Sequence, residues 1–240
     1  MTNKRIFLAA IVTLMVVPAL AAQNTPHAGK AIKLFNGKNL DGFYTWVENQ
    51  GKNQDPAHVF TVQGAVIHVS GTAMAYFATE AEYENYRLTA EFKWGEQTHP
   101  PRQGNARDSG ILFHFVGPDK IWPKSIEFQV IEGGTGDIIL VDGGAITAGG
   151  KALTEGRIDR KGKGKWDDVV GYRDPAGEVE KPHGQWNKLE LIAQGDTVKY
   201  YVNGKLVNEG TGASPQRGKI LFQSEGAELF YRNIKLTPLK

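Results

Sequence analysis

Hydrophobic and polar residues alternate in short runs from about residue 31 to the end of the chain. The run at 86–94 places Tyr86, Leu88, Ala90, Phe92 and Trp94 on one face of an extended strand and Arg87, Thr89, Glu91 and Lys93 on the other. The same period of two recurs at 109–116, 125–131, 187–194, 196–202, 219–224 and 228–236. Helical periodicity is confined to one candidate turn at 79–86, so the pattern predicts an all-β protein.

Turn signals separate these predicted strands. Asn203-Gly204 is a strong signal for a two-residue hairpin turn, and Gln63-Gly64 and Gly195-Asp196 indicate two more. Many short strands with alternating faces are typical of two packed antiparallel sheets, arranged as a jelly-roll sandwich. We expect one domain over residues 31–240 in which the first and last strands pair.

The first 22 residues have the pattern of a secretory signal peptide. Lys4 and Arg5 precede the apolar run at 6–17, and Pro18 precedes a small-residue end near Ala22. The alternative, a membrane anchor, is disfavoured because the run is short for a bilayer span. Cleavage would remove Lys4 and Arg5 and so lower the formal net charge from +2 to about zero. The mature protein would then be near neutral and would have no membrane span. The electrostatic argument for nucleic-acid binding is then lost.

The 240 residues include no cysteine, which excludes disulfides and thiolate chemistry. With the signal peptide, this composition predicts a periplasmic or secreted bacterial protein. The sequence also lacks a G-x-S-x-G elbow, a phosphate-binding loop, a dinucleotide fingerprint and H-E-x-x-H. Its six histidines are scattered, so no metal site can be assigned from spacing.

The run at 125–130 carries unusual polar residues for a strand. Ile126, Phe128 and Val130 share one face, so Glu127 and Gln129 share the other, either as a solvated exterior or as the floor of a site. We favour the site floor. Sandwich glycosidases often place two carboxylates on one strand, but this strand has one. A second acid would come from Glu91, Asp108 or Glu225.

Other strands carry further candidates. Alternation places His114 with Leu112, opposite Phe113 and Phe115, as a packed residue or as a catalyst. Arg232 shares a predicted face with apolar residues and needs a partner, either a structural carboxylate or a substrate oxygen. Gln223 and Glu225 share a face next to a glycine, and Trp122 lies in a predicted loop where it could stack on a sugar.

Residues 142–186 mix glycine, charge and a few aromatic residues. A long ordered loop of this kind inside a compact domain is usually functional. We expect Trp166 and Tyr172 to anchor it over a sheet, where it would cover the polar face; the alternative is a mobile surface excursion.

The ordered set of segments at 34–46, 83–94, 108–115, 125–130, 184–192, 200–207 and 220–239 resembles the 3-keto-disaccharide hydrolase domain family. The resemblance covers residues 31–240 and implies a jelly-roll sandwich of the concanavalin A-like lectin and glucanase type. It also implies cleavage of glycosides already oxidised to a ketone at sugar carbon 3, by proteins that bacteria commonly export. The positions that match the family are Glu127, Gln129, Trp186-Asn187, Gln223 and Arg232-Asn233. The chain departs from it at Asp108, usually asparagine, and His114, commonly arginine, which bears on substrate range and metal use.

The implied chemistry needs one base and a group that stabilises an enolate, because a ketone at carbon 3 acidifies the hydrogen on carbon 2. We expect Glu127 or His114 to be the base and Arg232 to stabilise the enolate, with a divalent metal held by Asp, Glu or His as the alternative cofactor. Gln129, Asp108, Gln223, Glu225 and Trp122 would bind an oligosaccharide or glycoside. Elimination followed by hydration would give net hydrolysis.

Two other functions use the same features. A non-catalytic, lectin-like carbohydrate-binding module would use the same polar face and aromatic residues but would change no substrate. A structural domain of the cell envelope would need neither a site nor a product.

Overall fold

A computed structural model describes residues 29–240, which form two antiparallel β-sheets and no helix. The predicted all-β jelly-roll sandwich is thereby confirmed. The predicted signal peptide at 1–22 lies outside this range. Over the residues described, no helix is long and apolar enough to cross a membrane.

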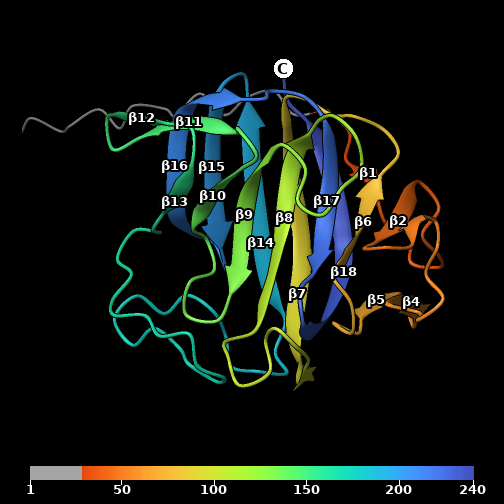
Figure 1. Ribbon diagram of the computed structural model, residues 1–240. Coiled ribbons are helices and arrows are strands. Elements are labelled where there is room, and N and C mark those ends of the chain that lie inside the picture. Colours follow the sequence, from red (N-terminus) through yellow and green to blue (C-terminus); the bar gives the residue numbers. More distant parts are fainter. Residues whose placement is uncertain (1–28) are drawn as a thin grey trace, which may run out of the picture.

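The two sheets lie face to face, and Figure 1 shows β8 and β9 of one sheet in front of β7 and β14 of the other. The eight-stranded sheet has the spatial order β13 (Gly156–Ile158), β10 (Ile138–Val141), β9 (Ser125–Ile131), β8 (Asp108–Phe115), β17 (Lys219–Ser224), β6 (Ala75–Thr79), β2 (Phe43–Val47) and β3 (Gly51–Lys52). The ten-stranded sheet has the order β12 (Lys151–Leu153), β11 (Ala145–Ala148), β16 (Lys205–Ser214), β15 (Thr197–Val202), β14 (Asn187–Gln194), β7 (Tyr86–Thr98), β18 (Ala227–Pro238), β5 (Val66–Val69) and β4 (Phe60–Gln63), with β1 (Ile32–Lys33) also paired to β18.

The inner faces of the sheets form the core. Phe128 of β9 stacks on Tyr200 of β15 with ring centroids 4.2 Å apart, which joins the two sheets. Phe77 and Phe222 stack at 4.8 Å on adjacent strands of the eight-stranded sheet. Truncating such a buried ring to alanine typically costs about 3–5 kcal/mol, so this layer fixes how the sheets sit on each other.

The predicted local signals appear as expected. Asn203 and Gly204 both have positive φ, 50° and 82°, and join β15 to β16 as a two-residue hairpin turn. The first strand pairs with the last, with Ile32 opposite Leu236.

The long segment between β13 and β14 is held by buried contacts. Arg160 forms an ion pair with Asp174 at 2.9 Å, and both side chains are buried. Trp166 and Tyr172 lie so close to Gly133 that a side chain there would meet both rings, and Trp166 Nε1 donates to the Glu132 carbonyl at 2.7 Å. These two aromatic residues anchor the segment, as predicted, but they do so against the turn after β9 and not over the face of a sheet. The segment lies at one end of the sandwich in Figure 1 (teal).

Candidate active site

The outward face of β8, β9 and β17 carries a cluster of buried polar side chains packed over a glycine, and we call this site the Glu127 hollow. Glu127 and Gln129 point outward from β9 because Ile126, Phe128 and Val130 fill the core. Gly110 of β8 is paired with Gln129, and a Cβ on Gly110 would collide with the side-chain oxygens of Glu127 and Gln223. Two polar side chains from neighbouring strands therefore converge over Gly110 and occupy the space that a larger residue at this position would need.

The polar side chains of this hollow are shielded from solvent. Glu127, Gln129, Asp108 and Gln223 are all less than 10% exposed, although they lie on the outward face. Oε1 of Gln223 is buried without a hydrogen-bond donor among residues 29–240. Buried polar atoms are normally paired, so this oxygen is available to a ligand hydroxyl.

Asp108 is the most highly connected member of the hollow. Its carboxylate accepts hydrogen bonds from the Gln129 amide and from the Arg102 guanidinium. Arg102 also donates to both oxygens of Asp168, at 3.0 and 3.1 Å. Because Asp168 belongs to the segment between β13 and β14, Arg102 joins that segment to the site.

Three carboxyl groups share the hollow, and their pKa values are raised. Burial, with the nearby charges of Glu225 and Asp108, raises the pKa of Glu127 well above its usual value; Arg157 opposes this. Burial and Glu225 likewise raise the pKa of Asp108 more than Arg102 lowers it. Burial raises the pKa of Glu225, just after β17, to about 7, again with Arg102 opposing. Burial thus brings the pKa of Glu225 close to neutral pH and favours the protonated forms of Glu127 and Asp108.

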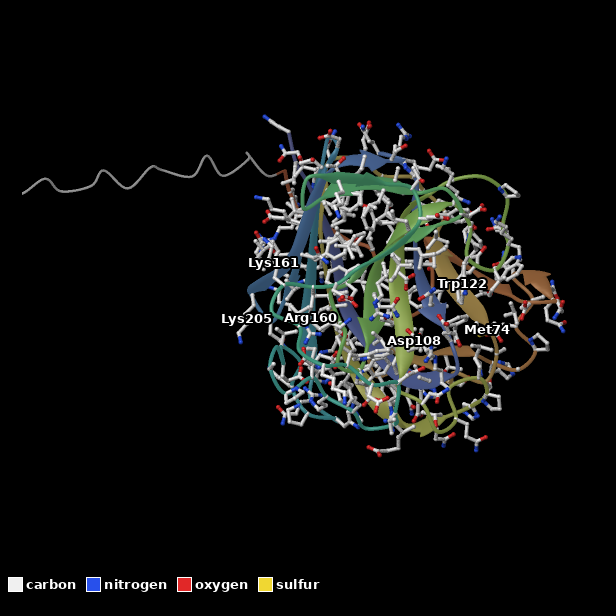
Figure 2. The ribbon with its side chains drawn as sticks, turned by 60° about the vertical axis from the view of Figure 1, so that its left-hand side comes forward. Met74, Asp108, Trp122, Arg160, Lys161 and Lys205 are labelled. Carbon is white, nitrogen blue, oxygen red and sulfur yellow. The ribbon has the colours of Figure 1, made fainter. Side chains whose placement is uncertain are left out.

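Aromatic residues continue the same outward face. Tyr76 of β6 is paired with Gln223, and Trp46 of β2 stacks on Tyr76 with ring centroids 5.4 Å apart. Trp122 packs, partly buried, against this aromatic cluster. Figure 2 shows Asp108 on the central strands with Trp122 and Met74 to one side. A ligand that reaches beyond Gln223 would therefore meet aromatic rings.

The structure does not bring His114 to the hollow, contrary to its prediction as a base. His114 has φ 55° and lies in a β-bulge, where Phe113 and Phe115 pair with Ile220 and Lys219 and His114 is skipped. The bulge turns the imidazole into the core, where it contacts Tyr86 edge-on at 5.5 Å, and sends Phe115 to the outward face. Burial lowers the pKa of His114 to about 4, against a smaller opposing effect of its hydrogen bond with the Pro215 carbonyl. His114 is a packed, neutral histidine.

The structure also does not bring Arg232 to the Glu127 site, contrary to the prediction. It lies on the outward face of the other sheet, donates to Glu91 at 2.7 Å and stacks over Trp186 at 3.9 Å. Neither Arg232 nor Glu91, one of the suggested second acids, reaches the Glu127 hollow. A bulge near Asn233, which has φ 54°, returns Ile234 to the core, so the predicted shared face of Arg232 and Ile234 does not form.

Sequence reasoning missed three members of the site. The glycine inside the β8 run was a usable signal, because glycine in a strand often marks a close approach. Arg102 and Asp168 come from loops with no periodicity, so no sequence pattern predicts that they are in contact.

Over residues 29–240, no three Asp, Glu or His side chains are arranged as ligands of a metal ion. The divalent metal considered as an alternative to Arg232 therefore has no set of three such ligands within the described part of the chain.

Three comparisons place the chain among known proteins. A family profile described as the 3-keto-alpha-glucoside-1,2-lyase-like domain matches residues 30–237. A search of curated proteins found no match. Among solved structures, a candidate glycosyl hydrolase from Parabacteroides distasonis ATCC 8503 has a TM-score of 0.57 and 20% identity over 88% of this chain and 94% of that chain. A Bacillus licheniformis beta-glucanase has a TM-score of 0.50 and 14% identity over 91% of this chain and 100% of that one. At these identities the structural likeness shows a shared fold.

Proposed function

Because this chain belongs to the 3-keto-alpha-glucoside-1,2-lyase-like domain family, we propose that it cleaves 3-keto-glycosides in the Glu127 hollow. The observation that carries the proposal is the buried Glu127 carboxyl group beside Gly110, with its raised pKa and a second acid nearby. A carbohydrate-binding module has no need of such groups, because burying a charge without a partner is costly.

The reaction is an elimination. The ketone at carbon 3 makes the carbon 2 hydrogen acidic, and Glu127 removes it as a proton when its carboxyl group is ionised. Because burial raises the pKa of Glu127, turnover should increase as pH rises. The electrons form an enolate, which collapses to restore the ketone, form the C1–C2 double bond and break the bond from C1 to the glycosidic oxygen. Protonated Glu225 gives its proton to that oxygen. Addition of water across the double bond then completes a net hydrolysis.

The remaining side chains bind and polarise the substrate. The enolate charge would be stabilised by the positive potential of Arg102 and Arg157, the two cations that act on the site carboxyls. Gln129 and Gln223 would hold sugar hydroxyls, since each presents amide groups to the hollow. Trp122 and Trp46 would contact the departing group.

The decisive experiment compares the wild-type protein with Glu127→Gln on a 3-keto-α-glucoside, with the unoxidised glucoside as control. General acid–base catalysis typically contributes about 10²–10⁴-fold, so we expect a turnover loss of that size and no reaction of the unoxidised sugar. Mass spectrometry distinguishes the elimination product from its hydrate by one water. Unchanged turnover in the correctly folded variant would remove Glu127 from the mechanism; binding without any product would favour the lectin-like alternative.

We also propose that the protein is exported to the periplasm or beyond, on the strength of the apolar run at 6–17 and the small residues up to Ala22. The mass of the protein recovered from a bacterial periplasmic extract tests this. A mature chain beginning near residue 23 is expected, and a full-length chain held in the cytoplasm would contradict it.

A further inference from the structure

A second hollow, of about 380 Å³, lies on the outward face of the ten-stranded sheet, over β4, β5, β7 and β18. It is on the opposite side of the core from Glu127, because the outward faces of the two sheets point away from each other. Its principal lining residues are Gln63, His68, Lys93, Trp186, Glu228 and Phe230. We propose that this hollow binds an acidic saccharide, with a uronate carboxylate on Lys93.

Aromatic rings form the walls of this hollow. Phe230 stacks on the His68 imidazole with ring centroids 5.0 Å apart and an interplanar angle of 23°. The Lys93 ammonium lies 4.9 Å from the Phe230 centroid and 5.4 Å from the Trp186 centroid. The Lys93 cation thus lies near both rings, and each ring is also stacked by a second side chain, Phe230 by His68 and Trp186 by Arg232.

The open charge of the hollow is positive. Glu228 is fully engaged, because it contacts His68 Nε2 at 2.8 Å and accepts the backbone N–H groups of Glu96 and Gln97 at 3.0 and 3.2 Å. The neighbouring Arg232 is paired with Glu91 at 2.7 Å. Lys93, in contrast, forms no ion pair with a carboxylate within residues 29–240.

These features select one class of ligand. A hollow of this volume accommodates a sugar residue, and aromatic walls with a few polar groups are typical of small-ligand sites. An ammonium held by rings but lacking an anionic partner complements a carboxylate, and the charge-assisted hydrogen bond is stronger than one to a neutral hydroxyl. A neutral saccharide would use the rings but leave Lys93 without an anionic partner. The inference does not depend on the elimination chemistry proposed for the other face.

The experiment is calorimetric titration of the full chain with trigalacturonate at low salt, with cellotriose as the neutral probe. We expect trigalacturonate to bind at least tenfold more tightly than cellotriose, and Lys93→Met to remove most of that difference. Lys199→Met is the matched control, because Lys199 is also half-buried on the outward face of this sheet, on β15, and it should bind as the wild type does.

A second variant separates the two faces. Glu127→Gln should bind trigalacturonate as the wild type does, since its side chain lies on the other sheet. Wild-type affinity in Lys93→Met, equal affinity for both saccharides, the absence of trigalacturonate binding, or its loss in Glu127→Gln would each overturn the proposal. Far-ultraviolet circular dichroism confirms that every variant is folded.

Discussion

The two outward faces of the sandwich are built by the same alternation but differ in what covers them. Every residue of β8 and β9 is buried, on both faces. On the middle of β7, in contrast, the outward residues Thr89, Glu91 and Lys93 are half-exposed while the inward ones are buried. The period of two therefore fixes which side chains point outward, and loops packed over the sheet decide whether those side chains remain in water.

This difference in cover gives the carboxyl groups opposite properties. Burial raises the pKa of Glu225 to about 7, with only Arg102 acting against it. Burial would also raise the pKa of Glu228 on the other face, but His68 and two backbone N–H groups outweigh it, and the pKa is lowered. Burial without a strong partner therefore favours the protonated form of Glu225, whereas the partners of Glu228 favour its ionised form.

The largest effect on turnover is expected from a substitution of Gly110, on the outward face of β8, β9 and β17, which we call the covered face. Gly110→Ala would place a methyl group against the side chains of Glu127 and Gln223. We expect turnover of a 3-keto-glucoside to fall by about 10²-fold or more, since small misplacements of catalytic groups have effects of that size. Overpacking would also lower the free energy of unfolding by about 1–3 kcal/mol.

Gly29→Ala is the control for that change, because a Cβ on Gly29 meets nothing closer than 3.5 Å. In steady-state kinetics and denaturant titration, the turnover and the free energy of unfolding of Gly29→Ala should be close to those of the wild type. Normal turnover in Gly110→Ala would mean that the hollow has room the structure does not show, and would place the reaction elsewhere.

The next largest effect is a difference between Glu225 and Glu228 in how the free energy of unfolding depends on pH. A carboxyl group whose folded pKa is raised binds more protons in the native state, so wild-type stability falls as pH rises from about 4.5 to about 7. Glu225→Gln removes this loss and should raise the free energy of unfolding by at most roughly 3 kcal/mol above pH 7. Below pH 4 the variant and the wild type should be equally stable.

Glu228→Gln should behave in the opposite way. Its lowered pKa stabilises the folded state above the unfolded pKa, and that contribution is lost as pH falls through the folded value. The variant should therefore be less stable than the wild type at pH 7, and the difference should shrink in acid. Denaturant titrations at several pH values measure both variants, and the same sign for both would refute the contrast.

A smaller effect is expected from removing the cation of the covered face. Arg102 lowers the pKa values of Asp108 and Glu225, so Arg102→Gln should move the titration of the site to higher pH. We expect the limbs of the pH–kcat/KM profile to shift to higher pH. Asp168→Asn removes the ion pair between Arg102 and Asp168 but keeps the Arg102 charge near Asp108 and Glu225, so it should shift the pH profile less than Arg102→Gln does.

The smallest effect on turnover is expected from the open face. Lys93→Met changes the charge of the second hollow, but a core layer separates it from Glu127. Its kcat/KM on a 3-keto-glucoside should stay within about twofold of the wild type. A tenfold loss would show that the two faces are coupled.

Much of the fold follows from patterns that local physics enforces. Alternation, the Asn203-Gly204 turn and the pairing of the chain ends were all predicted, and Glu127, Gln129 and Gln223 lie together on one outward face as expected. Asp108 and Glu225 join them electrostatically. These successes share one cause: each depends on regular pairing between neighbouring strands.

The wrong predictions share a cause as well. His114 and Arg232 were placed by counting in twos, and a bulge adds one residue to the count without changing the hydrophobic pattern visibly. An imidazole and an apolar ring are both acceptable on a buried face, so the sequence around His114 fits either register. The loop residues Arg102 and Asp168 depend on chain paths that have no period at all.

The hydrogen bond from Arg102 to Asp168 connects two separate parts of the chain. Strands β8 and β9 supply Asp108 and Glu127, while the segment between β13 and β14, anchored at Gly133 by Trp166 and Tyr172, supplies Asp168 to Arg102. The segment begins after β13, at the edge of the eight-stranded sheet, and contains no strand before β14, so a change in its length alters no strand pairing within it. Exchanging residues 159–186 between relatives would change the partner of Arg102 while Asp108 and Glu127 stay on their strands, and we propose it as a way to alter substrate preference.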